Sequence, residues 1–152
     1  MQSKIKSYSE DQRRVLSAWV KLNRSAESIA QTDWVIINEH GLTISQFGAM
    51  ETLYHKGPMC QKALGEKLLR SGGNMTKVVD NLERDGYVIR VRDEKDRRYF
   101  RIHLTQKGTD KIEFVFPKIL ANLMNRFSVL TKQEQQTLSG LCKRLGLGGK
   151  KE

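Results

Sequence analysis

Residues 68–105 read LLRSGGNMTKVVDNLERDGYVIRVRDEKDRRYFRIHLT, and this stretch decides the fold. Apolar residues at helical spacing predict a short helix from Gly73 to Asp85, which Gly86 ends. Two runs with the alternation of strands follow at 87–92 and 99–104. A helix followed by a hairpin with a basic tip is typical of a winged helix-turn-helix, in which one element fills a DNA groove and the other flanks it.

The segments before and after this module are predicted to be helical. Capping boxes, in which a hydroxyl residue precedes Glu or Gln by three positions, mark helix starts at Ser9, Thr43 and Thr131. Apolar residues spaced three and four apart after Ser9 predict a helix of roughly 25 to 30 residues, and Gly41 ends it. A second, shorter helix follows Thr43, and a third runs from Cys60 to Leu69. The third helix forms the helix-turn-helix with the helix that begins at Gly73.

The resulting fold class is mainly α with a small β-hairpin wing. We expect one domain at 9–145, in which dimerisation helices at 9–40 and 106–146 flank a DNA-binding module at 43–105. The residues after it, 147–152, are expected to form a disordered basic tail. The apolar stripes of the outer helices are too long for the small winged module to cover. We therefore expect these helices to pack on a second copy of the chain, as a homodimer.

Composition and charge restrict the class of protein. The chain has 152 residues with a formal net charge of +10, which favours a polyanionic partner such as double-stranded DNA. It contains neither a long apolar run nor the apolar core of a signal peptide, so we expect a cytoplasmic protein without a membrane span. The histidines do not pair with Cys or carboxylate residues at ligand spacing, so neither a metal nor a cofactor is expected. No residue pattern indicates an enzyme.

The start of the helix at Gly73 carries the groups that major-groove binding requires. Glycines let the backbone approach DNA closely, and short polar side chains reach base edges or phosphates. The predicted contacts are Ser71, Gly72, Gly73, Asn74, Thr76 and Lys77. Alternatively, Ser71 and Asn74 only cap the helix.

The turn of the hairpin carries the predicted minor-groove contacts, Lys95, Asp96, Arg97 and Arg98. Arginine suits the narrow minor groove, where the negative potential is enhanced. Asp96 cannot attract DNA, and we expect it to hold the guanidinium of Arg98 in one orientation through a bidentate pair. The alternative is a solvated charged turn without a DNA contact.

Short motifs in this order and spacing make the chain resemble the MarR family of transcriptional regulators. They are Leu42-Thr43 through Phe47, Gly57-Pro58-Met59, Gly73-Asn74-Met75-Thr76, Leu82-Glu83-Arg84-Asp85-Gly86, Asp96-Arg97-Arg98 and Leu104 through Gly108. The resemblance spans roughly Ser9 to Leu145. It implies a triangular homodimer on a pseudo-palindromic operator, with Arg98 in the minor groove and Asp96 supporting it. It also implies a repressor that a small phenolic or aromatic ligand, or an oxidant, releases.

The resemblance places a ligand pocket between the dimer region and the winged module. The residues that would line it include Trp19, Trp34, Phe47 and Met50, although an apolar stripe is more often core than pocket. Oxidant-sensing relatives place their cysteine near the start of the first helix, and this chain has none there. Cys60, near a helix start, is therefore the candidate redox thiol, with a structural thiol as the alternative.

Two functions remain open from the sequence. The first is a sequence-specific transcriptional regulator. The second is a non-specific basic DNA-binding or architectural protein, for which the net charge of +10 would set an affinity that depends on salt and not on sequence.

Overall fold

The computed structural model describes residues 8–68 and 72–148. The elements in chain order are α1 (Glu10–Glu39), α2 (Ile44–Lys56), β1 (Met59–Cys60), α3 (Gln61–Lys67), α4 (Gly72–Arg84), β2 (Val88–Arg92), β3 (Phe100–Leu104), α5 (Gln106–Phe127) and α6 (Lys132–Gly146). The mainly helical winged helix-turn-helix that the sequence predicts is confirmed. None of the helices in the described ranges is both long enough and apolar enough to span a membrane.

The helix starts lie where the capping boxes place them. Ser9, Thr43 and Thr131 each accept a hydrogen bond from the backbone amide three residues later, and the side chain there accepts one in return. α1 is 30 residues long, at the upper end of the prediction. Gly41 follows the end of α1 with φ of 74°. This left-handed conformation is costly for other residues, so glycine suits the position.

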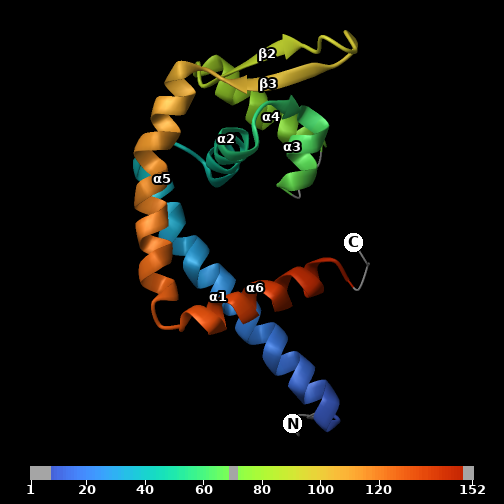
Figure 1. Ribbon diagram of the computed structural model, residues 1–152, viewed down its shortest axis with the longest axis vertical. Helices are drawn as coiled ribbons and strands as arrows, with labels where there is room; N and C mark the ends of the chain where they lie inside the picture. The colour runs from blue at the N-terminus through green and yellow to red at the C-terminus, as the bar shows by residue number, and fades with distance from the viewer. Residues whose placement is uncertain (1–7, 69–71, 149–152) are drawn as a thin grey trace, which may run out of the picture.

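Figure 1 shows the winged module at one end of the molecule and α6 with the N-terminal half of α1 at the other. α5 contacts both α1 and α2, so it joins the two parts. Pro117 lies inside α5, and the helix continues through it. Leu147 is the C-cap of α6, and residues 149–152 of the predicted tail lie outside the described ranges.

The wing contains a strand that the sequence analysis missed. β2 and β3 form the predicted antiparallel hairpin, and β1 adds to the other edge of β3 with Met59 opposite Ile102. The sequence analysis instead began a helix at Cys60. That helix begins at Gln61, because Cys60 has the extended backbone of an N-cap. A run of two residues is too short to show strand alternation, so no periodic signal marked it.

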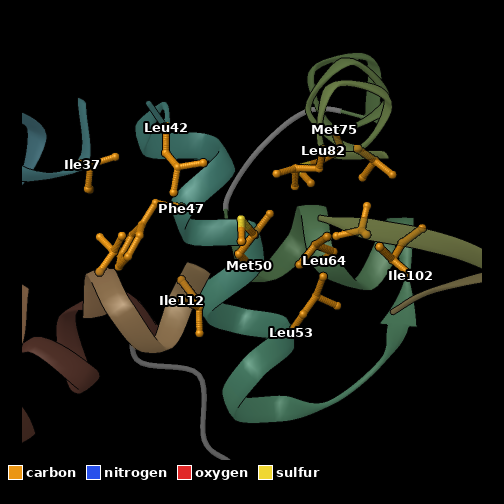
Figure 2. Packing of buried hydrophobic residues seen from close by; sticks show 14 of the residues in the cluster. Ile37, Leu42, Phe47, Met50, Leu53, Leu64, Met75, Leu82, Ile102 and Ile112 are labelled. Carbon is orange, nitrogen blue, oxygen red and sulfur yellow. The ribbon is translucent and has the colours of Figure 1, made fainter. Parts of the chain in front are cut away.

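The hydrophobic core lies where α2, α3, α4, α5 and the sheet meet, as Figure 2 shows. Its fully buried side chains include Met50, Leu64, Met75, Leu82 and Ile112. α6 is different, because none of its residues, all of which the structure describes, is buried. α1 contributes only Ile37 to the buried set of the described chain. The apolar faces of these outer helices are therefore exposed.

α5 begins against the turn that joins α4 to the wing. Thr105 caps α5 and its hydroxyl donates a hydrogen bond of 2.6 Å to the carbonyl oxygen of Gly86. Gly108 faces the same turn, and a Cβ atom there would lie 2.1 Å from the carbonyl oxygen of Tyr87. Only glycine lets the first turn of α5 approach so closely.

We expect Gly108→Ala to lower the free energy of unfolding by about 1–3 kcal/mol, because the added methyl group meets a backbone oxygen that cannot move alone. Gly140 in α6 is the matched control, since a Cβ atom there meets nothing within 4 Å. Gly140→Ala should raise stability by about 0.5–1 kcal/mol through helix propensity. Urea denaturation at one protein concentration measures both values. Equal effects of the two substitutions would contradict the close approach at Gly108.

Candidate nucleic-acid interface

The start of α4 presents polar side chains to solvent. Met75 and Val79 are fully buried and hold the helix on the core. Asn74, Thr76 and Lys77 lie outside this buried stripe and are exposed. The helix backbone begins at Gly72, one residue before the predicted start, and Ser71 lies outside the described residues. The predicted major-groove contacts that the structure describes therefore lie together at the N-terminal end of α4.

α3 contributes a residue to this surface that the sequence analysis did not identify. Gln61, the first residue of α3, donates a hydrogen bond of 2.7 Å from Nε2 to the Oγ1 atom of Thr76. The bond orients the Thr76 hydroxyl and ties the starts of α3 and α4 together. No sequence pattern indicated it, because the partners are 15 positions apart on different helices.

A polar groove of about 300 Å³ separates the start of α2 from α4. It is lined by Thr43, Ser45, Gln46, Asn74, Lys77, Val78 and Asn81. Thr43 is the N-cap of α2, so the groove has backbone amides of a helix start on one side and an exposed lysine on the other. Both groups attract phosphate oxygens. The groove thus extends the polar surface of α4 to a third helix.

The wing tip is an ordered turn. Asp93 accepts hydrogen bonds from the backbone amides of Lys95 and Asp96, at 2.8 and 3.1 Å. These two bonds hold the pKa of the Asp93 carboxyl below its usual range, and a weaker contribution comes from Arg101. Partial burial of the carboxyl opposes the shift. Arg92 donates from Nη1 to the carbonyl oxygen of Arg97 at 2.8 Å. These contacts fix the loop that carries the predicted minor-groove residues.

Arg98 projects from this turn in a defined orientation. The predicted bidentate pair is present, because Nε of Arg98 lies 3.0 Å from Oδ1 of Asp96 and Nη2 lies 2.7 Å from Oδ2. These side-chain hydrogen bonds, together with one from the Arg98 backbone amide, lower the pKa of Asp96, so the pair with Arg98 persists to a more acidic pH than an ordinary aspartate would allow. The Arg98 side chain is nonetheless 83% exposed. Lys95 and Arg97 are exposed beside it.

Arg90 on β2 connects the wing to α4. Its Nη2 atom lies 2.5 Å from Oδ1 of Asp80, and its Nη1 atom lies 2.5 Å from Oε2 of Glu83. The Glu83 carboxylate also accepts from the backbone amide of Arg90, at 3.2 Å. Desolvation disfavours the charged guanidinium, but the bonds to Asp80 and Glu83 outweigh it and raise the pKa of Arg90.

Comparison with known proteins agrees with this geometry. A model described as the MarR family matches residues 42–100, which cover most of the winged module. The uncharacterised HTH-type transcriptional regulator YkoM of Bacillus subtilis is 33% identical over 138 residues, 91% of this chain and 90% of its own length. The chain belongs to the MarR family of transcriptional regulators. As a member of this family, it is a DNA-binding helix-turn-helix regulator and not an enzyme.

Other relatives of this MarR-family regulator extend the comparison. MhqR of Bacillus subtilis is 34% identical over 135 residues, 89% of this chain and 93% of its own length. The solved structure of a MarR family protein from Bacillus stearothermophilus covers 93% of this chain and 98% of its own, with a TM-score of 0.74 and 28% identity. NadR, solved in complex with 4-hydroxyphenylacetate, shares the fold with a TM-score of 0.76 and 20% identity, covering 95% and 97% of the two chains.

The four predicted pocket residues do not lie together in the MarR-family chain. Phe47 and Met50 belong to the buried core. Trp34 lines an open pocket of about 590 Å³ with Glu27, Ala30, Gln31, Val35 and Ile44. Trp19 is exposed on α1, 15 residues before Trp34, which is roughly 22 Å along a helix that rises 1.5 Å per residue. Trp34 is therefore the one of the four that lines this pocket.

Cys60 lies on β1, the strand at one edge of the small sheet. It is half-buried, lies opposite Arg101 in the sheet and is the N-cap residue of α3. Cys142, the other cysteine, is exposed on α6. Within the described ranges of this regulator, no group of three or more His, Cys, Asp or Glu residues is placed to hold a metal ion.

Proposed function

We propose that this MarR-family chain represses transcription by binding a pseudo-palindromic operator as a homodimer. The observation that carries the proposal is the oriented arginine of the wing. Asp96 fixes the Arg98 guanidinium in one direction on an ordered turn, which a merely solvated turn would not require. The exposed start of α4 supplies groups for the major groove, and the groove beside it supplies groups for phosphates.

The non-specific alternative rests on the net charge of +10 alone. It does not require an ordered wing tip or a bond that orients the hydroxyl of Thr76. A regulator that reads sequence needs both elements held in place, because base contacts depend on the direction of each side chain. The geometry therefore supports the sequence-specific function better.

We expect the purified protein to recover genomic fragments that share one inverted-repeat motif. Asn74→Ala should cost about 1–3 kcal/mol and relax base choice within the half-site, as for one good base contact. Arg98→Ala should weaken binding and lower the preference for A·T-rich flanks. Fragment selection followed by titration measures these effects.

The matched control is Arg14→Ala, because Arg14 is also an exposed arginine held by an aspartate, Asp11 at 2.6 Å, but lies on α1 away from the wing. Unrelated fragments whose yield follows only salt would favour the non-specific protein. Equal weakening of all sequences by Asn74→Ala would make Asn74 a cap or phosphate contact.

The proposed homodimer accounts for the exposed apolar surface of the outer helices. Val15 and Trp19 on α1 are 65% and 60% exposed, and Leu145 on α6 is 68% exposed. Apolar side chains at helical spacing on α1 and on α6 give these helices an exposed surface typical of a protein interface. A second copy can cover it because α1 and α6 of each chain offer the same surface to the other.

We expect sedimentation equilibrium at micromolar concentration to give twice the mass of the chain. Trp19→Lys should shift the equilibrium towards the monomer, because it places a charge in the proposed apolar interface. Val91→Lys on the wing is the control, since Val91 is also exposed, at 41%, but lies on the wing strand. A wild-type protein that sediments as a monomer would exclude this interface.

We also propose that the pocket beside Trp34 binds the signal that releases the regulator from DNA. Its lining is apolar apart from Glu27 and Gln31, and it offers an indole ring against which a small aromatic ligand can stack. The fold neighbour NadR was solved with such a ligand, 4-hydroxyphenylacetate. In this chain Glu27 would repel a carboxylate, so a neutral phenol fits the lining better. Oxidation of Cys60 is the alternative signal.

Neutral phenols should therefore raise the melting temperature more than 4-hydroxyphenylacetate does in a thermal shift assay. Trp34→Ala should abolish the increase, because it removes the aromatic wall of the pocket. Tyr99→Ala, which removes an exposed aromatic side chain from the wing, is the control. No stabilisation by any phenol, or stabilisation that survives Trp34→Ala, would contradict this ligand site.

A further inference from the structure

We infer that Arg90 is a positioning residue that joins the DNA-reading helix α4 and the wing into one rigid unit. This inference rests on the proposed function, since it concerns how α4 and Arg98 reach DNA together. It adds a residue that touches neither groove in the proposed complex and acts through the two elements that do.

The contacts of Arg90 span the two elements directly. One guanidinium nitrogen binds Asp80 and the other binds Glu83, each at 2.5 Å, and both acids lie on α4. The backbone amide of Arg90 adds a third bond, to Glu83 at 3.2 Å. Strand and helix are thus joined through both the side chain and the main chain of one residue.

The other ion pairs do not make this connection. Arg84 pairs with its neighbour Asp85, and Arg98 pairs with Asp96 inside the turn. Arg101 pairs with Asp93 within the hairpin. Among the ion pairs of the described residues, only those of Arg90 link α4 to the hairpin.

Arg90 is the less accessible member of its ion pairs. Its side chain is 22% exposed, whereas those of Asp80 and Glu83 are 58% and 40% exposed and that of Arg98 is 83% exposed. Val88, two residues before it on the same face of the strand, is fully buried against the core. Water still reaches the two carboxylates, so the contribution of Arg90 is geometric: the packed strand limits how far the guanidinium can move.

Arginine suits this position because its planar guanidinium presents several donors in a fixed fork. Lysine keeps the charge but presents a single ammonium group, which cannot hold Asp80 and Glu83 in the same rigid geometry. Arg90 also offsets two negative charges on the helix that must approach DNA phosphates. The experiment must therefore separate the geometric effect from the effect of charge.

The geometric effect matters most at the wing tip. Arg98 lies beyond the end of β2, which ends at Arg92, so the wing extends from Arg90 as a lever of roughly 3.3 Å per strand residue. A small rotation of the strand on α4 is enlarged at the tip. The packing of Val88 holds the first residue of β2, and the Arg90 contacts hold the strand beyond it, so that Arg98 is placed for the minor groove.

A double-mutant cycle between Arg90 and Arg98 tests the inference on the operator selected above. We expect Arg98→Ala to weaken operator binding about tenfold in the wild type, the size of one good DNA contact. In the Arg90→Met background the same change should cost less than about twofold, because a wing that is not positioned gains little from Arg98. Fluorescence anisotropy on operators with A·T-rich and G·C-rich flanks gives the affinities.

Arg90→Lys separates geometry from charge, and it should behave like Arg90→Met in the cycle. Full coupling in Arg90→Lys would show that charge suffices and would overturn the inference. A tenfold cost of Arg98→Ala in both backgrounds would overturn it too, and would reduce Arg90 to a general structural residue. Arg14→Met, which removes an exposed arginine paired on α1, should leave the coupling unchanged.

If Arg90→Met does not fold, as judged by circular dichroism, the paired variant Asp80→Asn with Glu83→Gln replaces it. That variant leaves Arg90 in place and removes both acidic partners, and it should lose the coupling to Arg98 in the same way. Unchanged coupling there would overturn the inference. An Arg98→Ala protein that binds DNA like the wild type would instead contradict the proposed wing contact, and this inference with it.

Discussion

The burial of one face of α4 is the constraint on which the rest of the structure depends. Met75, Val79 and Leu82 are fully buried, and they fix the helix on the core from its first turn to its last. Because that face of α4 is buried, the polar residues at the start of α4 face outward. The same packing brings Val88 of β2 against the core, so the wing starts from a fixed place. Hydrophobic burial thus determines where the polar, DNA-facing groups lie.

Ion pairs then orient side chains whose direction hydrophobic packing does not determine. Two arginines are oriented in this way by carboxylates, one near the core and one at the surface. Arg90 is largely buried and holds the base of the wing through Asp80 and Glu83, whereas Arg98 is exposed and is held by Asp96 at the tip. Asp80, Glu83 and Asp96 therefore orient the two guanidinium groups of this basic chain. This explains why a turn with little net charge can still be suited to a nucleic acid.

The sequence predicted the elements that have strong local signals. Capping boxes placed three helix starts, and Gly41 and Gly86 marked two ends, because caps and left-handed turns depend on residues close in the chain. The pair of Asp96 and Arg98 was predictable for the same reason. Contacts between distant segments were not. Gln61 with Thr76, and Arg90 with α4, depend on how separate elements pack, and no periodic pattern encodes them.

The four residues that the resemblance assigned to a ligand pocket have different surroundings in the structure. Phe47 and Met50 share the apolar character of Trp34, but helix packing places them in the core and leaves Trp34 beside an open pocket. That pocket also involves Ile44, the first residue of α2. Its neighbours Thr43 and Ser45 line the polar groove that faces Asn74 and Lys77 of α4. The first turn of α2 therefore separates the proposed ligand pocket from the proposed phosphate groove. A ligand that shifted the backbone at Ile44 would also shift Thr43 and Ser45, because all three belong to the same capped turn.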